Sequence, residues 1–290
     1  GGGLACKGHA ARVCRAGWRG SQRCERARRP VECCATARRK REGAVLLGTT
    51  SAREFGSRRT PEGEMVPPAR NPVDRERTVG GSTGGGAAAL AAGLCALSHG
   101  GDGGGSIRIP ASCCGVVGLK PSRGRISSGP ILGEDWAGLT TAGVLGRTVA
   151  DAALGLDAMA GHLPGDPYWA DTTEAFLPAA GRDPGVLQVG WTVDVQAPVD
   201  PEVRAAVERI AGQLERLGHH VTRVSPDLGQ FRDIIQPLAG IAIGRPPIPR
   251  PALPDPPHSP SPAPAGQPSP PRYHAPRTRP PDAHTHDSGP

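Results

Sequence analysis

The clearest periodic pattern in this chain lies in residues 201–217, where apolar side chains recur every three or four positions. Asp200 and Pro201 are typical of an N-cap and of the first residue of a helix. Gly218 is suited to ending that helix. The sequence therefore predicts an amphipathic helix here. Its apolar face is expected to consist of Val203, Ala206, Val207, Ile210, Leu214 and Leu217.

Weaker patterns predict the remaining elements. Apolar spacing predicts a helix in residues 147–161, and an alanine-rich run predicts a buried helix in residues 85–96. Strands are predicted at residues 44–48, 187–191 and 220–224. Extended segments are expected at residues 106–110 and 116–120, around a small-residue turn at 111–115. The alternation of strands and helices predicts an α/β fold with a mixed or parallel sheet.

Two glycine clusters, GGSTGGG at residues 80–86 and DGGGS at 102–106, each enclose a serine. Glycine loses more backbone entropy on folding than other residues, so such clusters need a physical reason. One reason is a reacting group that approaches backbone N–H groups closely, with Ser82 and Ser106 as candidate nucleophiles. Phosphate binding is the alternative. The first cluster lacks the GK[ST] ending of a P-loop, and no dinucleotide-binding glycine pattern follows a clear strand, so nucleotide binding is disfavoured.

Four motifs occur in order along the chain: GAVLLG at residues 43–48, ARNPVD at 69–74, GGSTGG at 80–85 and DGGGSIRIPASCCGVVGLKP at 102–121. Together they resemble the amidase signature family, whose members hydrolyse amides with a Ser–Ser–Lys triad. The variants DGGGS, SCCG and KPSRGR, with GDPY at 165–168, are most similar to the subgroup that includes cyclic-dimer hydrolases acting on nylon oligomers. The resemblance implies an α/β/α fold with a mixed central sheet, here incomplete and with disordered termini.

The resemblance also implies roles for individual residues. Ser106 matches the nucleophile, and Ser82 matches the bridging serine, whose preceding peptide bond is cis in the family. Lys7 stands where the family places its base, although Gly8 replaces the usual acid. Such a base must be neutral, and burial is what lowers a lysine pKa sufficiently. The backbone N–H groups expected to stabilise the oxyanion are those of Gly103, Gly104, Gly105 and Ser106.

Neighbouring side chains are expected to be structural. Ser82 or Thr83 could instead cap the following helix. Asp102 is interpreted as a hydrogen-bond acceptor, and Arg108 as a brace for the loop. Cys113, Cys114 and Lys120 are expected to pack beside the site, and residues 131–141 to border the substrate pocket.

Composition divides the chain into a basic segment at residues 1–42, a partial amidase signature domain at 43–243 and a Pro-rich tail at 244–290. The first 42 residues hold 12 basic and 3 acidic residues, although the whole chain has a net charge of only +7. Nucleic-acid binding is disfavoured because Trp18 is the only aromatic residue there. We expect a poorly structured, solvated segment instead. The tail is expected to be disordered, with polyproline docking to a partner as the alternative.

The cysteines form no CxxC pair, which disfavours zinc, and no metal or organic cofactor is expected. The chain contains no apolar run of about 18 residues and no signal-peptide pattern, so we predict a cytoplasmic protein without a membrane span. The predicted function is hydrolysis of a small-molecule carboxamide. The alternatives are an inactive truncated family member and the amidase component of a tRNA-dependent amidotransferase. The oligomeric state stays open.

Overall fold

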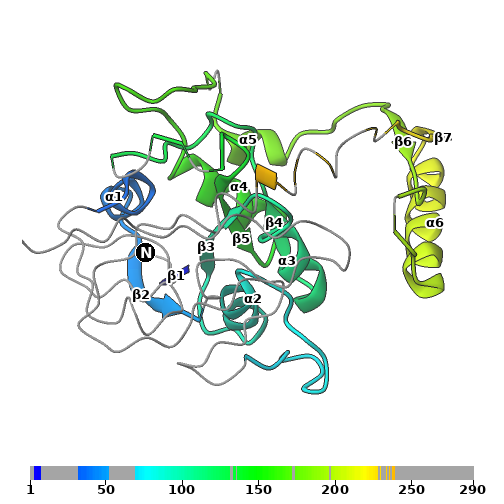
Figure 1. Ribbon diagram of the computed structural model, residues 1–290, viewed down its shortest axis with the longest axis horizontal. Helices are drawn as coiled ribbons and strands as arrows, with labels where there is room; N and C mark the ends of the chain where they lie inside the picture. The colour runs from blue at the N-terminus through cyan, green and yellow to red at the C-terminus, as the bar shows by residue number, and fades with distance from the viewer. Residues whose placement is uncertain are drawn as a thin grey trace, which may run out of the picture.

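The computed structural model describes the backbone of residues 3–7, and then residues 32–51, 69–130, 133–134, 136–171, 174–195, 197–227, 229, 233, 235 and 237–238. A five-stranded sheet with the order β2-β1-β3-β5-β4 forms its centre (Figure 1). The strands of this sheet are β1 (Gly3–Lys7), β2 (Val45–Thr50), β3 (Leu97–Asp102), β4 (Val117–Leu119) and β5 (Thr141–Gly146).

The sheet is mixed, as predicted. Strand β1 runs parallel to both β2 and β3, whereas β5 runs antiparallel to β3 and β4. The carboxyl ends of β1 and β3 therefore lie at the same edge of the sheet. The chain leaves β3 at this edge to enter the second glycine cluster.

Helices cover both faces of the sheet. They are α1 (Cys34–Arg41), α2 (Gly84–Ala91), α3 (Arg108–Cys114), α4 (Val149–Asp157) and α5 (Phe176–Ala180). The neighbouring residues Val144 and Leu145 of β5 point to opposite faces, because side chains alternate along a strand. Leu145 packs in a cluster with residues of α2 and α3, whereas Val144 packs with residues of α1 and α4. Figure 1 shows these two layers on either side of the strands.

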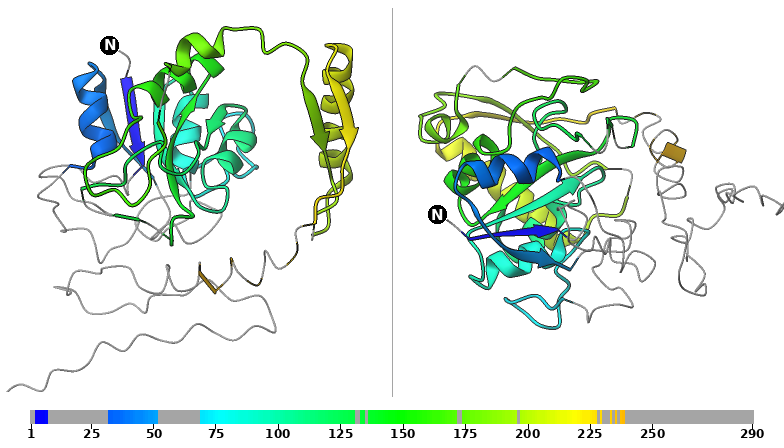
Figure 2. Two further views of the ribbon diagram at one scale, coloured as in Figure 1. Left: turned by 90° about the horizontal axis from the view of Figure 1, so that it is seen from above. Right: turned by 90° about the vertical axis from the view of Figure 1, so that its left-hand side faces the viewer.

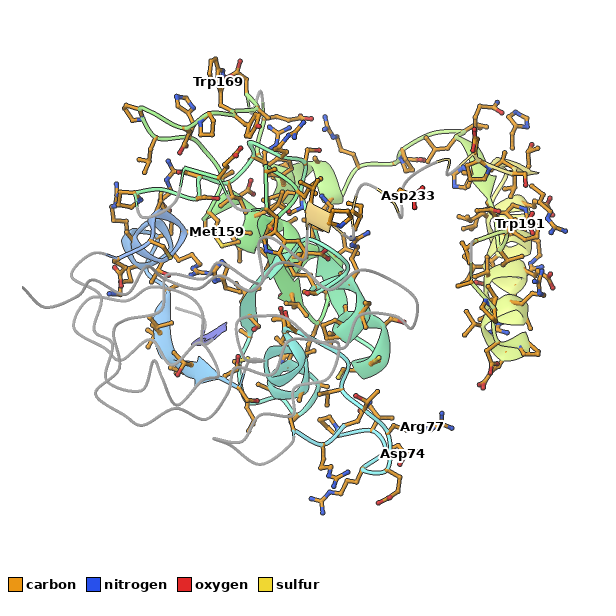
Figure 3. The ribbon with its side chains drawn as sticks, in the orientation of Figure 1. Asp74, Arg77, Met159, Trp169, Trp191 and Asp233 are labelled. Carbon is orange, nitrogen blue, oxygen red and sulfur yellow. The ribbon has the colours of Figure 1, made fainter. Side chains whose placement is uncertain are left out.

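Polar contacts fix the layer formed by α1 and α4. Thr148 and Asp151 form a reciprocal capping box at the start of α4. At the other end of that helix, the guanidinium of Arg38 in α1 donates to the carbonyl oxygens of residues 159–162 at 2.6–3.2 Å. Met159, labelled in Figure 3, is fully buried beneath this junction. Helix α1 is thereby fixed to the end of α4.

A second unit stands apart from the five-stranded sheet (Figures 1 and 2). It consists of the parallel pair β6 (Gln188–Trp191) and β7 (His220–Arg223) with α6 (Pro201–Arg216) between them. The predicted capping by Asp200 is confirmed, since its side chain accepts from Glu202 N–H at 2.8 Å. The predicted apolar face is covered only in part: Val203, Ile210 and Leu217 are 55%, 53% and 73% exposed.

Two predictions around the glycine clusters were wrong. The helix expected over residues 85–96 ends at Ala91, because Gly93 adopts a φ of 72° and reverses the chain into β3. The segment expected to be extended at 106–110, with a turn at 111–115, instead contains α3. Pro110 is the third residue of α3, where a missing N–H costs no helical hydrogen bond.

The expectation that residues 1–42 are poorly structured was also wrong for the part that the structure describes. Gly3–Lys7 form the second strand of the sheet, and α1 buries Cys34 and Ala35. Residues 8–31 and the predicted tail at 244–290 lie outside the described residues. Across the described ranges, no helix has both the length and the apolar character needed to cross a membrane.

Candidate active site

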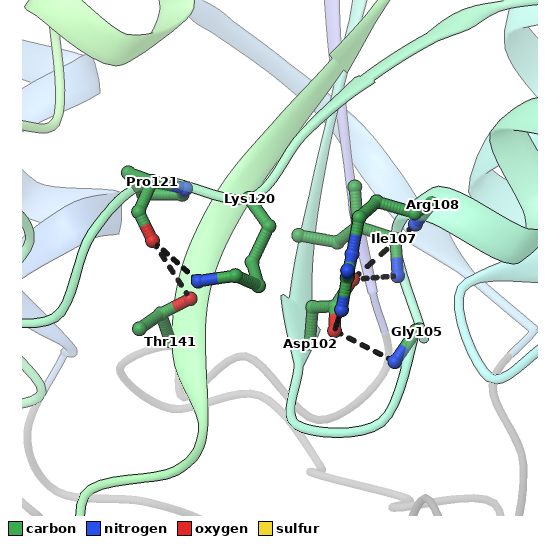
Figure 4. Close-up of polar contacts among 7 residues, drawn as sticks. All are labelled: Asp102, Gly105, Ile107, Arg108, Lys120, Pro121 and Thr141. Carbon is green, nitrogen blue, oxygen red and sulfur yellow. Dashed lines mark hydrogen bonds and ion pairs between the residues drawn. The ribbon is translucent and has the colours of Figure 1, made fainter. Parts of the chain in front are cut away.

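A loop of residues 103–106 connects β3 to α3, and the carboxylate of Asp102 organises it (Figure 4). Asp102 ends β3 and is fully buried. Its Oδ1 accepts from Gly105 N–H at 2.7 Å, and its Oδ2 accepts from the N–H groups of Ile107 and Arg108 at 3.2 and 3.3 Å. The Arg108 guanidinium donates from Nε and Nη2 to the two oxygens, both at 2.9 Å. The structural roles predicted for Asp102 and Arg108 are confirmed.

These contacts determine the charge state of Asp102. Burial opposes ionisation, but the hydrogen bonds from the Arg108 side chain and from the Gly105 and Ile107 backbone together outweigh it. The pKa of Asp102 therefore lies below its ordinary value, and the pKa of Arg108 lies above its own, chiefly through the hydrogen bond to Asp102. The loop is held by a carboxylate that is ionised at neutral pH.

The segment containing Ser82 is attached directly to this loop. The backbone N–H of Thr83 donates to the carbonyl oxygen of Ser106 at 3.1 Å. The peptide bond between Gly81 and Ser82 is cis, which confirms the expectation from the family resemblance. Ser82 is 1% exposed, whereas Ser106 is half-buried. The structure thus brings the two predicted serines into adjoining backbone segments.

Lys7 is the last residue of β1 and is paired in register with Thr50 of β2. On the other side of β1, Cys6 is paired with His99 of β3. The backbone of Lys7 therefore reaches the sheet edge from which the loop of residues 103–106 departs. The Lys7 side chain lies outside the described residues, so its role as a base stays a prediction.

The backbone of the loop carries the predicted oxyanion donors. The N–H of Gly105 is engaged by Asp102. Within the described part of the chain, the structure gives no acceptor for the N–H groups of Gly103, Gly104 and Ser106. Gly105 has a φ of 108°, a conformation that glycine adopts without a steric penalty. These glycines leave backbone donors accessible at the end of β3.

Gly103 is closely packed, whereas Gly104 is not. A Cβ atom at Gly103 would lie 2.6 Å from Thr140 Oγ1 and 3.2 Å from the ring of Trp136, but one at Gly104 would meet nothing within 4 Å. Trp136 has a φ of 52°, which is unusual for a bulky residue. The positions of Thr140 and Trp136 beside the loop were not identified from the sequence. No motif marks them, and only the broad expectation for residues 131–141 covers them.

A pocket opens next to this contact. Its lining includes Thr140 and Thr141, together with polar groups from residues 123–128 and from the Glu134 and Tyr168 region. Thr141 is paired in register with Asp102 across β3 and β5. The expectation that residues 131–141 border a pocket is confirmed for the described members of that range.

The cysteines near the site are not activated. Burial, reinforced by the neighbouring Cys113, raises the pKa of Cys114 to about 11, so this thiol is protonated at neutral pH. Cys113 also has a raised pKa because of burial. Among the described residues, no three His, Cys, Asp or Glu side chains form a group that could hold a metal ion.

A family model described as Amidase matches residues 18–237 of the chain. The chain belongs to the amidase signature family. It is 44% identical over 219 residues to 6-aminohexanoate-cyclic-dimer hydrolase of Paenarthrobacter ureafaciens, covering 72% of this chain and 44% of that protein. It is 41% identical over 202 residues to a glutamyl-tRNA(Gln) amidotransferase subunit of Thermus thermophilus, covering 69% and 43%.

A solved structure of 6-aminohexanoate cyclic dimer hydrolase complexed with substrate has the same fold. Its TM-score is 0.79 at 35% sequence identity, over 83% of this chain and 53% of that one. The α/β fold predicted from the amidase signature motifs is thereby confirmed. The chain spans less than half the length of the two amidase signature relatives named above.

The contrast between the two neighbouring glycines predicts different effects on stability. Gly103→Ala must displace Thr140 or Trp136, so we expect it to lower the free energy of unfolding by about 1–3 kcal/mol. Gly104→Ala has space around its Cβ atom and restricts the unfolded chain, so we expect a change within about 1 kcal/mol in either direction. Urea unfolding of both variants measures these differences. Equal destabilisation by the two substitutions would contradict the packing described for this amidase signature loop.

The low pKa of Asp102 predicts how its contribution to stability depends on pH. A carboxyl whose pKa is lower in the folded than in the unfolded protein stabilises above its unfolded pKa, near 4, and loses this contribution as pH falls through the folded value. Asp102→Asn should therefore cost about 3 kcal/mol at pH 7, because it breaks a buried ion pair. The difference from the parent should shrink below about pH 4.

Urea unfolding of both proteins between pH 7 and pH 3 measures this difference. Asp74→Asn is the matched control, since the ion pair of Asp74 with Arg77 is solvent-exposed. A deficit for Asp102→Asn that stays constant over the whole range would show that ionisation of Asp102 does not stabilise the loop.

Proposed function

We propose that this chain hydrolyses a carboxamide through an acyl-enzyme on Ser106, with Ser82 as proton relay and Lys7 as base. The observation that carries the proposal is the loop of residues 103–106. It presents backbone N–H groups next to a serine, and Asp102 holds it in that geometry. Family membership supports the same reaction, since the hydrolase from Paenarthrobacter ureafaciens is named for action on a cyclic dimer.

In the first half of the reaction, Ser106 Oγ attacks the amide carbon. Its proton passes to Ser82, which in turn transfers its own proton to the neutral amine of Lys7. The carbonyl oxygen becomes an oxyanion. We assign its stabilisation to the N–H groups of Gly103, Gly104 and Ser106, because Gly105 N–H is engaged by Asp102. Return of the proton to the amide nitrogen then releases an amine and leaves an ester on Ser106.

In the second half, water attacks the ester carbon and transfers a proton to the relay. The carbon–oxygen bond to Ser106 breaks, Ser106 regains its proton and a carboxylic acid is released. The overall change is amide plus water to acid plus amine, without an oxidant or a cofactor. Catalysis in a reducing, cytoplasmic compartment stays a prediction from the sequence.

A second candidate is an amidase component that supplies ammonia from an amide to a partner enzyme. The 41% identity to the glutamyl-tRNA(Gln) amidotransferase subunit of Thermus thermophilus favours it. The same acyl-enzyme chemistry on Ser106 would serve both functions. They differ in the fate of the amine, which a partner enzyme would consume in the second case.

A fluorophosphonate probe tests the proposed chemistry directly, because it phosphonylates an activated serine. We expect the full chain to be labelled, Ser106→Ala to show no labelling, and Ser82→Ala and Lys7→Ala to react at least about 1000-fold more slowly. Ser112→Ala, an exposed serine of α3, is the control and should react like the parent. Absence of labelling in the parent would contradict the proposal and favour an inactive family member.

A further inference from the structure

The pocket beside Gly103 is lined mainly by polar groups. It contains the hydroxyl groups of Ser128, Thr140 and Thr141, together with the exposed charged residues Arg123 and Glu134. Its larger apolar surfaces come from Ile126, Pro167 and the ring of Tyr168. A site with this lining can exchange hydrogen bonds with a ligand over most of its surface.

The charged groups of the pocket are arranged around Tyr168. The Arg123 guanidinium lies 4.5 Å from the centre of the Tyr168 ring, and the Tyr168 hydroxyl donates to Glu134 at 3.2 Å. Asp166 is already satisfied, because its two oxygens accept from the Ser127 hydroxyl and the Leu163 N–H at 2.9 and 2.7 Å. One exposed cation and one exposed anion therefore border the pocket, without an excess of either charge.

The pocket continues from the nucleophile loop. Thr140 lines it and also packs against Gly103, and Thr141 is paired with Asp102 in the sheet. A substrate whose carbonyl oxygen is bound at the Gly103 and Gly104 N–H groups would have one substituent directed along Thr140. The pocket is therefore the adjoining space available to that substituent.

We propose that this pocket binds one substituent of the reacting carbonyl and selects compact, hydrogen-bonding amides over amides with a long alkyl chain. The inference rests on the proposed function, whose substrate class it specifies. An alkyl chain would remove water from the hydroxyl groups, Arg123 and Glu134 without returning hydrogen bonds, which is unfavourable. A polar substituent replaces those hydrogen bonds and avoids this cost.

Two fluorophosphonates that share the reactive group and the reporter test the selectivity, one with a decyl linker and one with a tri(ethylene glycol) linker. Both are racemic at phosphorus, so the linker can extend to either side of Ser106. We expect the parent to react at least about tenfold faster with the glycol probe. The double variant Arg123→Leu/Glu134→Leu should lower that rate ratio at least about fivefold, because it exchanges polar for apolar lining.

The matched control is Arg75→Leu/Glu76→Leu, which removes the same two charges from an exposed turn. Figure 3 shows the flanking residues Asp74 and Arg77 at the opposite end of the molecule from Trp169, whose backbone packs on Gly124 of the pocket. This control should keep the parent ratio. Ser128→Ala, compared with the exposed Ser122→Ala, is the second test and should shift the ratio in the same direction as the double variant.

The outcomes separate the two proposals. A lower ratio in both pocket variants, with unchanged controls, supports the pocket assignment. Equal rates for the two probes in the parent, or an unchanged ratio in the pocket variants, overturn it while Ser106-dependent labelling preserves the proposed hydrolysis. Absence of Ser106-dependent labelling with both probes overturns the proposed hydrolysis and the pocket assignment together.

Discussion

The buried carboxylate of Asp102 is the interaction on which the site depends. It accepts hydrogen bonds from three backbone N–H groups and from both donating nitrogens of Arg108, and so connects the end of β3, the glycine loop and the start of α3. A buried anion with fewer partners would be unfavourable. The backbone around it must therefore keep one path. That path leaves the loop N–H groups beside Ser106 accessible to a substrate oxygen.

The sheet supplies the rest of the geometry. Because β1 and β3 are parallel, Lys7 and the nucleophile loop reach the same edge, although 95 residues separate Lys7 from Asp102 in the sequence. Strand β5 is antiparallel to β3, so its first residues, Thr141 and the preceding Thr140, lie beside the same loop. The pocket and the loop therefore share one sheet edge, and the helix layers on both faces hold the strands that form it.

The sequence was most informative where the local signals agreed. Residues 200–218 combine a cap, an apolar period and a terminal glycine, and α6 has these limits within two residues. Strand β3 carries the sequence LSHGGD, whose single large apolar residue gives no alternating pattern, and it is stabilised by strands on both sides. Helix α3 was missed because its start depends on Asp102 and Thr83, whose contacts are tertiary. The serines were found through motif resemblance, whereas Thr140 and Trp136 became evident only from packing.

A crystal structure of the full chain after reaction with a fluorophosphonate tests the central claim most directly. The organisation of the loop by Asp102 predicts phosphorus bonded to Ser106 Oγ and a phosphoryl oxygen about 2.7–3.1 Å from the N–H groups of Gly103 and Gly104. It also predicts that Asp102 still accepts from Gly105 and Ile107. A phosphoryl oxygen directed into solvent, or a loop that has left Asp102 in the adduct, would contradict it.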